Sequence, residues 1–197
     1  DGTYVPLAVN GGSACSAAGA AVQLDFDVNG LSTPNMLYAD AGALSLTAIY
    51  ASNSGSDSGL TMTGSGQVIV GPKYFSFSAV ATPQQAGVAV VPLASATSIT
   101  VSALAADGKT VTRNFGREAP LTTVSLSPTV DAPTFAGASK PAVTGSVNFT
   151  NSNGIGTASN LSWPEVGKLR FTANTSTFLG AASPALPATG DSGQVQY

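Results

Sequence analysis

Short apolar runs alternate with clusters of turn-forming residues along this chain, and the three-to-four-residue spacing of an amphipathic helix is almost absent. The 22 Gly and 12 Pro residues interrupt the 197-residue sequence at short intervals. Turn signals often stand about eight to twelve positions apart, which is the strand spacing of an all-β sandwich. The pattern therefore predicts an all-β protein.

Each alternating run is a predicted strand. In the N-terminal part, strands are expected at Tyr4–Val9, Ala21–Val28, Ala43–Tyr50 and Gln67–Val70, with a loop at Ala51–Gly59. After Gly71–Pro72, strands are expected at Lys73–Ser78, Ser98–Ala105, Thr110–Phe115, Leu121–Ser127, Ala142–Thr150, Lys168–Asn174 and Gln194–Tyr197, and Ala181–Gly190 is an expected loop. Asn29–Gly30 and Asp107–Gly108 are tight-turn signals. Alternation directs Phe75 and Phe77 to the core and places Tyr74 at the junction between the two parts.

One phrase occurs twice. Tyr38 to Ala48 reads Tyr-Ala-Asp-Ala-Gly-Ala-Leu-Ser-Leu-Thr-Ala, and Trp163 to Ala173 reads Trp-Pro-Glu-Val-Gly-Lys-Leu-Arg-Phe-Thr-Ala. Each copy is followed by the same Ser-Gly-Gln-Val tetrapeptide, at residues 65–68 and 192–195. Two matches in the same order indicate two related β units in tandem.

The two predicted units are residues 1–71 and 72–197. Only 37 residues precede Tyr38, so the first unit is predicted to be short or incomplete. An incomplete sandwich leaves a strand edge unpaired. Either the natural chain extends before Asp1 and supplies the missing strand, or a neighbouring molecule does.

The acidic residue and the Gly of each phrase are predicted to form a structural corner. In immunoglobulin-like sandwiches an aromatic residue near such a turn braces the loop that crosses between sheets, the Gly adopts backbone angles that other residues avoid, and the acid accepts backbone N–H bonds. Tandem immunoglobulin-like β-sandwich units are therefore expected. The corner residues are Tyr38, Asp40, Gly42, Trp163, Glu165 and Gly167.

Several stretches resemble MshQ-like proteins, large surface proteins associated with mannose-sensitive haemagglutinin and other type IV pilus systems of Gram-negative bacteria. Leu161–Ala173 with Phe178–Gly180 is similar to one phrase of that family, and Ile99–Phe115 is similar to a second. Val70–Phe75 resembles a third junction but lacks its Arg. The resemblance implies an extracellular, pilus-associated adhesive module at the bacterial cell surface, without catalytic residues.

Composition agrees with a surface location and excludes two kinds of partner. Charged residues make up 9% of the chain, against roughly 25% in an average globular protein. A formal charge of −3 with seven basic residues offers no footprint for nucleic acid or an anionic membrane. No apolar run reaches the length of a membrane span, so membrane insertion is not expected.

The chain has few of the residue types that enzymes use for catalysis. The chain has no His, which excludes a Ser-His-Asp triad and a His-based zinc site. Its one Cys, Cys15, cannot form an intrachain disulfide or a thiolate metal cluster. The chain is therefore predicted not to be an enzyme and to need no cofactor.

Calcium is the one metal with a candidate site. Asp25-Phe26-Asp27-Val28-Asn29-Gly30 matches the first half of a calcium-binding loop, with oxygen ligands at Asp25, Asp27 and Asn29. Position twelve of that loop is Met36 instead of Glu. The favoured interpretation is a strand with Leu24, Phe26 and Val28 inward, followed by an Asn-Gly turn.

Function is predicted as a structural and adhesive module whose partners are other copies, other segments of a larger surface protein or pilus, and host or surface glycans. Two alternatives stay open at this stage. One is an extracellular filament subunit that assembles by strand donation. The other is a carbohydrate-binding accessory module that would use Tyr74 and Trp163.

Overall fold

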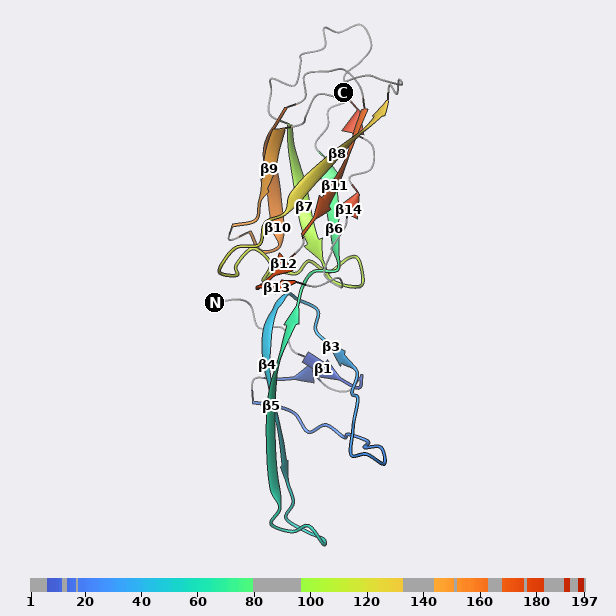
Figure 1. Ribbon diagram of the computed structural model, residues 1–197, viewed down its shortest axis with the longest axis vertical. Helices are drawn as coiled ribbons and strands as arrows, with labels where there is room; N and C mark the ends of the chain where they lie inside the picture. Colours follow the sequence, from blue (N-terminus) through green and yellow to red (C-terminus); the bar gives the residue numbers. More distant parts are fainter. Residues whose placement is uncertain are drawn as a thin grey trace, which may run out of the picture.

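The computed structural model describes residues 7–11, 14–16, 18–79, 97–132, 144–150, 152–162, 168–175, 177–182, 190–191 and 195–196. These residues form strands, turns and loops without a helix, and the architecture is that of immunoglobulin-like β-sandwiches. Figure 1 shows strands β1 to β5 in one part of an elongated molecule and strands β6 to β15 in the other. No helix that could cross a membrane occurs among the described residues.

The N-terminal part contains a small sheet and a long ribbon. The small antiparallel sheet has the order β2-β1-β3 and consists of β1 (Leu7–Val9), β2 (Ala14–Cys15) and β3 (Met36–Leu37). The ribbon is formed by β4 (Gly42–Ala51) and β5 (Thr61–Val70). It is paired along its whole length, from Gly42 opposite Val70 to Ala51 opposite Thr61.

The C-terminal part is a sandwich of two sheets. The first has the order β6-β7-β10-β9 and contains β6 (Tyr74–Ala79), β7 (Thr97–Leu104), β10 (Ile155–Ser162) and β9 (Thr144–Asn148). In the second, β11 (Lys168–Asn174) pairs with β8 (Ser125–Ala132), β14 (Gly190–Asp191) and β15 (Val195–Gln196). A two-stranded sheet of β12 (Thr177–Phe178) and β13 (Ala181–Ala182) completes the described strands.

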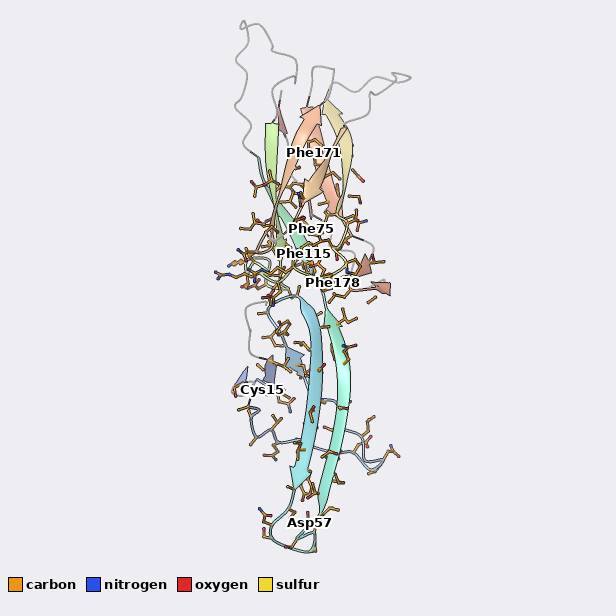
Figure 2. All side chains as sticks on the ribbon, turned by 90° about the vertical axis from the view of Figure 1, so that its left-hand side faces the viewer. Cys15, Asp57, Phe75, Phe115, Phe171 and Phe178 are labelled. Carbon is orange, nitrogen blue, oxygen red and sulfur yellow. The ribbon has the colours of Figure 1, made fainter. Side chains whose placement is uncertain are left out.

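The core of the C-terminal sandwich is built around Phe115. Its ring meets the edges of Phe75 and Phe149 at centroid distances of 5.8 and 5.0 Å and stacks on Phe178 at 5.6 Å. Figure 2 shows Phe75, Phe115 and Phe178 close together in the middle of the molecule. Edge-on and offset aromatic pairs add stability beyond the area that they bury. Phe75 and the partly buried Phe77 both belong to this core and Tyr74 is 41% exposed, which confirms the predicted alternation.

The predicted strand Thr110–Phe115 is wrong. Only Val111 forms a bridge, to Leu104, and the chain then turns. The backbone N–H and the hydroxyl of Thr112 both donate to the Ala103 carbonyl, at 2.9 and 3.0 Å. The Phe115 N–H donates to the Thr112 carbonyl at 3.1 Å. A turn, not a strand, therefore delivers Phe115 to the core.

The predicted strand Ala21–Val28 is also wrong. The segment is irregular, and Phe26 and Val28 are 64% and 101% exposed instead of facing inward. The turn that follows is confirmed, because the Gly30 N–H donates to the Asp27 carbonyl at 3.0 Å. Alternation produces a strand only where a neighbouring strand accepts the backbone bonds, and none lies beside this segment among the described residues.

The remaining strand predictions agree in part. The predicted strands at 43–50, 73–78, 98–105 and 168–174 correspond to β4, β6, β7 and β11, and Ala51–Gly59 is mostly loop as expected. Strand β5 starts earlier than predicted, β8 lies further along the chain, and β10 was not predicted at all. Residues 4–6 of the predicted strand Tyr4–Val9 and residues 183–189 of the predicted loop Ala181–Gly190 lie outside the described residues.

The repeated phrase leads to the same strand pairing in both units. In the first, Leu44 of β4 lies opposite Val68, the Val of the first Ser-Gly-Gln-Val tetrapeptide. In the second, the equivalent Leu169 of β11 lies opposite Val195, the Val of the second tetrapeptide. At this position equivalent residues form the same antiparallel pair, so the two units share a structural element and not only a sequence pattern.

Gly154 is required by both backbone angle and space. Its φ is +77°, and a Cβ there would lie 2.2 Å from the Thr112 carbonyl oxygen. Gly108 has a similar φ of +67° but open space around the position of its missing Cβ. Substitution at Gly108 would therefore cause backbone strain alone, whereas substitution at Gly154 would cause strain and steric overlap together.

We expect Gly154→Ala to lower the free energy of unfolding by about 3 kcal/mol, since the substitution combines left-handed strain with displacement of packed backbone. Gly108→Ala, with strain alone, is expected to cost about 1 kcal/mol. Urea unfolding monitored by tryptophan fluorescence and circular dichroism measures both. Equal losses would show that the close approach at Thr112 contributes nothing.

The turn at Asp107 gives a prediction on pH. Its carboxylate accepts the hydroxyl and the N–H of Thr110 at 2.6 and 2.8 Å and the N–H of Lys109 at 2.9 Å. These bonds, the Thr110 hydroxyl first, lower the pKa of Asp107 to about 2. Because the folded-state pKa is depressed, the stabilisation is complete above the ordinary value of 3.8 and is lost as pH falls through about 2.

We expect the amide proton shift of Thr110 to titrate with a midpoint near 2 in an NMR pH series, following the Asp107 pKa. Thr110→Val removes the hydroxyl donor and should move the midpoint upward, toward 3.8. An unchanged midpoint in the variant would contradict the assigned cause.

Candidate functional site

The first corner connects the ribbon to the C-terminal sandwich. Asp40 is 3% exposed, and its carboxyl oxygen Oδ1 accepts the N–H of Ala41 at 2.7 Å and the N–H of Asn114 at 3.0 Å. Ala41 is fully buried in the same core cluster as Phe115. On the other strand, the Lys73 N–H, just after β5, donates to the Leu104 carbonyl at 2.8 Å. Both ribbon strands are thus attached at their base.

The other corner residues occupy distinct positions. Gly42 has a φ of +153°, and a Cβ there would lie 4.0 Å from the Tyr38 hydroxyl. Tyr38 lines a hollow between the small sheet and the ribbon. The structure therefore brings Tyr38, Asp40 and Gly42 together at the start of β4. Trp163, Glu165 and Gly167 lie outside the described residues.

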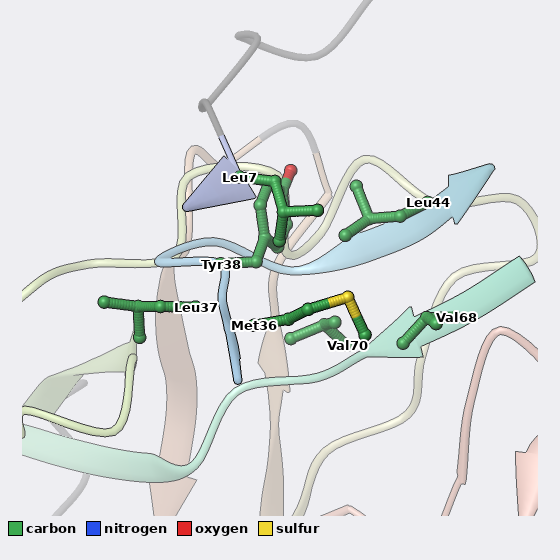
Figure 3. Close-up of a pocket in the computed structure, with 7 residues that line it drawn as sticks. All are labelled: Leu7, Met36, Leu37, Tyr38, Leu44, Val68 and Val70. Atoms are coloured by element: carbon green, nitrogen blue, oxygen red, sulfur yellow. The ribbon is translucent and has the colours of Figure 1, made fainter. Parts of the chain in front are cut away.

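The hollow beside Tyr38 has a volume of about 230 Å³. Figure 3 shows its lining side chains, which come from β1, β3, β4, β5 and the residue after β3; they are Leu7, Met36, Leu37, Tyr38, Leu44, Val68 and Val70. Ligand pockets usually reach about 300 Å³ or more and contain several convergent polar groups. Here the Tyr38 hydroxyl is the one polar side-chain group of the lining, so the hollow is better explained as the loosely packed interior of the N-terminal sandwich.

The far end of the ribbon carries exposed apolar side chains, which we call the tip patch. Its members are Tyr50, Leu60 and Met62, with exposed fractions of 44, 45 and 55%; Ile49, 70% exposed, lies on the other face of the ribbon. Tyr50 and Met62 lie directly opposite each other in the ladder. Neither strand of the ribbon contains a charged residue. An exposed apolar surface at a projecting end is typical of a contact site.

The loop between the strands contains a side-chain hydrogen bond to a charged group. The Tyr50 hydroxyl donates to the Asp57 carboxylate. This bond lowers the pKa of Asp57 and raises the pKa of Tyr50. It fixes the Tyr50 ring beside the loop, which Figure 2 shows at the extreme end of the molecule, near the labelled Asp57.

The structure places the three candidate calcium ligands on the irregular segment before residue 28 and in the turn that follows it. Asp27 Oδ1 accepts the backbone N–H of Leu31 at 2.8 Å and of Asn29 at 2.9 Å, and these bonds, Leu31 first, lower the pKa of Asp27. Asp25 and Asn29 are exposed. The part of the chain that the structure describes contains no cluster of three His, Cys, Asp or Glu side chains that could hold a metal ion.

Two features of the ribbon were not predicted from sequence. The Tyr50–Asp57 bond joins a predicted strand to a predicted loop, and a tyrosine seven residues before an aspartate has no recognisable signature. The sequence predicted an unpaired strand edge in the first unit but did not indicate which strand carries it. The structure assigns this edge to β4, which pairs with β5 alone among the described strands.

Asp40→Ala tests the attachment at the base of the ribbon. The substitution leaves the N–H groups of Ala41 and Asn114 without their acceptor in a buried site, so we expect it to lower the free energy of unfolding by about 1–3 kcal/mol. Hydrogen exchange of the Asn114 amide should accelerate. Asp40→Asn keeps an oxygen acceptor and should retain most of the protection; equal acceleration in both variants would contradict the proposed role of Oδ1.

Comparison with known proteins found one similarity, in the N-terminal part of the chain. Residues 2–65 match the family model described as "Domain of unknown function (DUF6701), first Ig-like domain". No curated protein and no solved structure shows a significant match. The matched region contains β1 to β4 and the start of β5, so the N-terminal part of this chain is similar to an immunoglobulin-like domain.

Proposed function

We propose that this chain is a non-catalytic structural and adhesive module of a bacterial cell-surface or pilus-associated protein. The similarity of residues 2–65 to an immunoglobulin-like domain supports a structural module, because such domains serve mainly as scaffolds for contact surfaces. The resemblance to MshQ-like proteins supports the surface and pilus context.

The tip patch carries this proposal. A well-packed sandwich at one end of the molecule holds a ribbon whose other end exposes Tyr50, Leu60 and Met62. Exposed apolar side chains stabilise a complex when a partner covers them, because their surface is then removed from water. Such side chains are therefore typical of contact sites. The chain, with 9% charged residues, offers little electrostatic attraction, so contact through apolar and aromatic surface is the expected mode.

The partners proposed for this patch are neighbouring segments of a larger surface assembly and glycans of a host or surface. Aromatic rings such as Tyr50 supply flat apolar area with a polar edge, which suits both classes. Catalysis is not proposed, since the chain has no His and a single Cys. The carboxyl groups with lowered pKa values are held by turn hydrogen bonds at Asp27 and Asp107 and by the Tyr50 hydroxyl at Asp57.

Localisation and adhesion test the proposal together. An antibody against the chain should label intact cells of the source bacterium, and labelling only after permeabilisation would contradict a surface location. Beads coated with the chain should be retained on glycan-coated or polystyrene surfaces. Tyr50→Ser with Met62→Ser should reduce retention about fivefold, equivalent to about 1 kcal/mol of lost contact. Thr63→Ser, outside the patch, is the matched control and should retain as wild type.

A further inference from the structure

The two units differ at one strand edge. In the C-terminal unit, β11 is covered on one side by β15 and β14 and on the other by β8, whose pairing runs from Lys168 to Asn174. In the N-terminal unit, the equivalent strand β4 pairs with β5 and with no other described strand. Because Leu44–Val68 and Leu169–Val195 match in register, the unpaired side of β4 is the side that β8 occupies on β11.

Strand β4 itself carries none of the features that usually block an open edge. Soluble proteins usually block an open edge with Lys, Pro, a bulge or a very short strand. Strand β4 is ten residues long, contains neither charge nor Pro, and pairs with β5 without a register shift. The adjacent side chains Ile49 and Tyr50 are 70 and 44% exposed. The edge is therefore competent to accept another strand.

The chemistry of β8 indicates what that strand is. Six residues of β8 read Ser125-Leu126-Ser127-Pro128-Thr129-Val130, and six residues of β4 itself read Ser45-Leu46-Thr47-Ala48-Ile49-Tyr50. Both begin with Ser-Leu, continue with a small hydroxyl residue and a small apolar residue, and end with a β-branched residue and an apolar one. Strand β4 of a second copy is thus a chemical counterpart of β8.

The register agrees with this correspondence. Ser125 of β8 lies opposite Asn174, and Val130 lies opposite Leu169. The β4 residues equivalent to Asn174 and Leu169 are Ile49 and Leu44. In an antiparallel β4–β4 pair centred on Thr47, Ser45 of the second copy lies opposite Ile49 and Tyr50 of the second copy lies opposite Leu44. Each β4 residue of the second copy therefore lies opposite the same position of β4 as its β8 counterpart does on β11.

We propose that two copies of this chain associate through antiparallel pairing of their β4 edges, with Thr47 on the two-fold axis. The product is a continuous four-stranded sheet of order β5-β4-β4-β5. Residues of the same parity stay on one face of a sheet, so Leu44, Leu46 and Tyr50 of both copies form one apolar surface with Val68 and Met62. The contact is isologous and closes at two copies, unlike strand donation along a filament.

Disulfide trapping reports the register directly. Residues opposite each other in an antiparallel pair have Cα atoms about 4.5–5.5 Å apart, within the range that a disulfide spans. In a Cys15→Ser background, Thr47→Cys should form a covalent dimer on mild oxidation. Ser45→Cys alone should not, whereas Ser45→Cys combined with Ile49→Cys should. Thr63→Cys, on β5, is the matched control and should stay monomeric.

Sedimentation equilibrium of the unmodified chain provides the second measurement. We expect a reversible dimer and no larger species. Thr47→Lys places two like charges opposite each other and should weaken the dimer about tenfold or more, whereas Thr63→Lys should leave the dimer unchanged. Circular dichroism of the two Lys variants verifies that each is folded.

Three results would overturn the proposal. The first is a monomer at all concentrations, which would mean that the β4 edge is filled from within the chain or stays open. The second is the formation of filaments in place of a dimer. The third is a dimer whose stability does not change with Thr47→Lys. None of these depends on where the protein is located in the cell, so the association can fail while the surface function holds, and the reverse is also true.

Discussion

The attachment of the β4–β5 ribbon to the C-terminal sandwich depends on the hydrogen bond between the Asn114 N–H and the Asp40 carboxyl oxygen. This bond joins residues 74 positions apart in the chain, at a partly buried site in which Asp40 itself is buried. A buried N–H without an acceptor costs about 1–3 kcal/mol, so the turn that contains Asn114 and the corner that contains Asp40 each fix the position of the other. The same turn delivers Phe115 to the centre of the aromatic core, which couples the base of the ribbon to the best-packed region of the molecule.

Stability is distributed unevenly along the molecule as a result. The C-terminal sandwich buries five phenylalanines in one cluster, whereas the N-terminal sandwich encloses a hollow of about 230 Å³. An isolated two-stranded ribbon is marginally stable in water, so β4 and β5 depend on their attached base for order. Local opening should start at the ribbon tip and in the exposed segment around Phe26, where few buried contacts oppose it.

The repeated phrase allowed more of the fold to be predicted than periodicity did. It located β4 and β11 and related them correctly, because a corner followed by a strand is specified locally by a Gly, an acid and alternation. Strand β10 was missed since its sequence, Ile-Gly-Thr-Ala-Ser-Asn-Leu-Ser, has few large apolar residues and relies on close packing of Gly156 against Phe149. Alternation was misleading at Ala21–Val28, where no neighbouring strand is present to accept the bonds. The corner role of Asp40 followed from its neighbours in sequence, but its partner Asn114 is determined by tertiary structure and has no local signal.

The way in which both strands of the ribbon are fixed at one end has a mechanical consequence. A load applied at the Tyr50–Asp57 loop pulls β4 and β5 in the same direction, so the strands do not slide past each other and the hydrogen bonds of their ladder carry little of the tension. The force travels along two covalent chains in parallel and reaches the sandwich at Asp40 and at the Lys73–Leu104 bond. A thin ribbon can therefore transmit tension without being unzipped, and resistance to pulling is set by the anchored base.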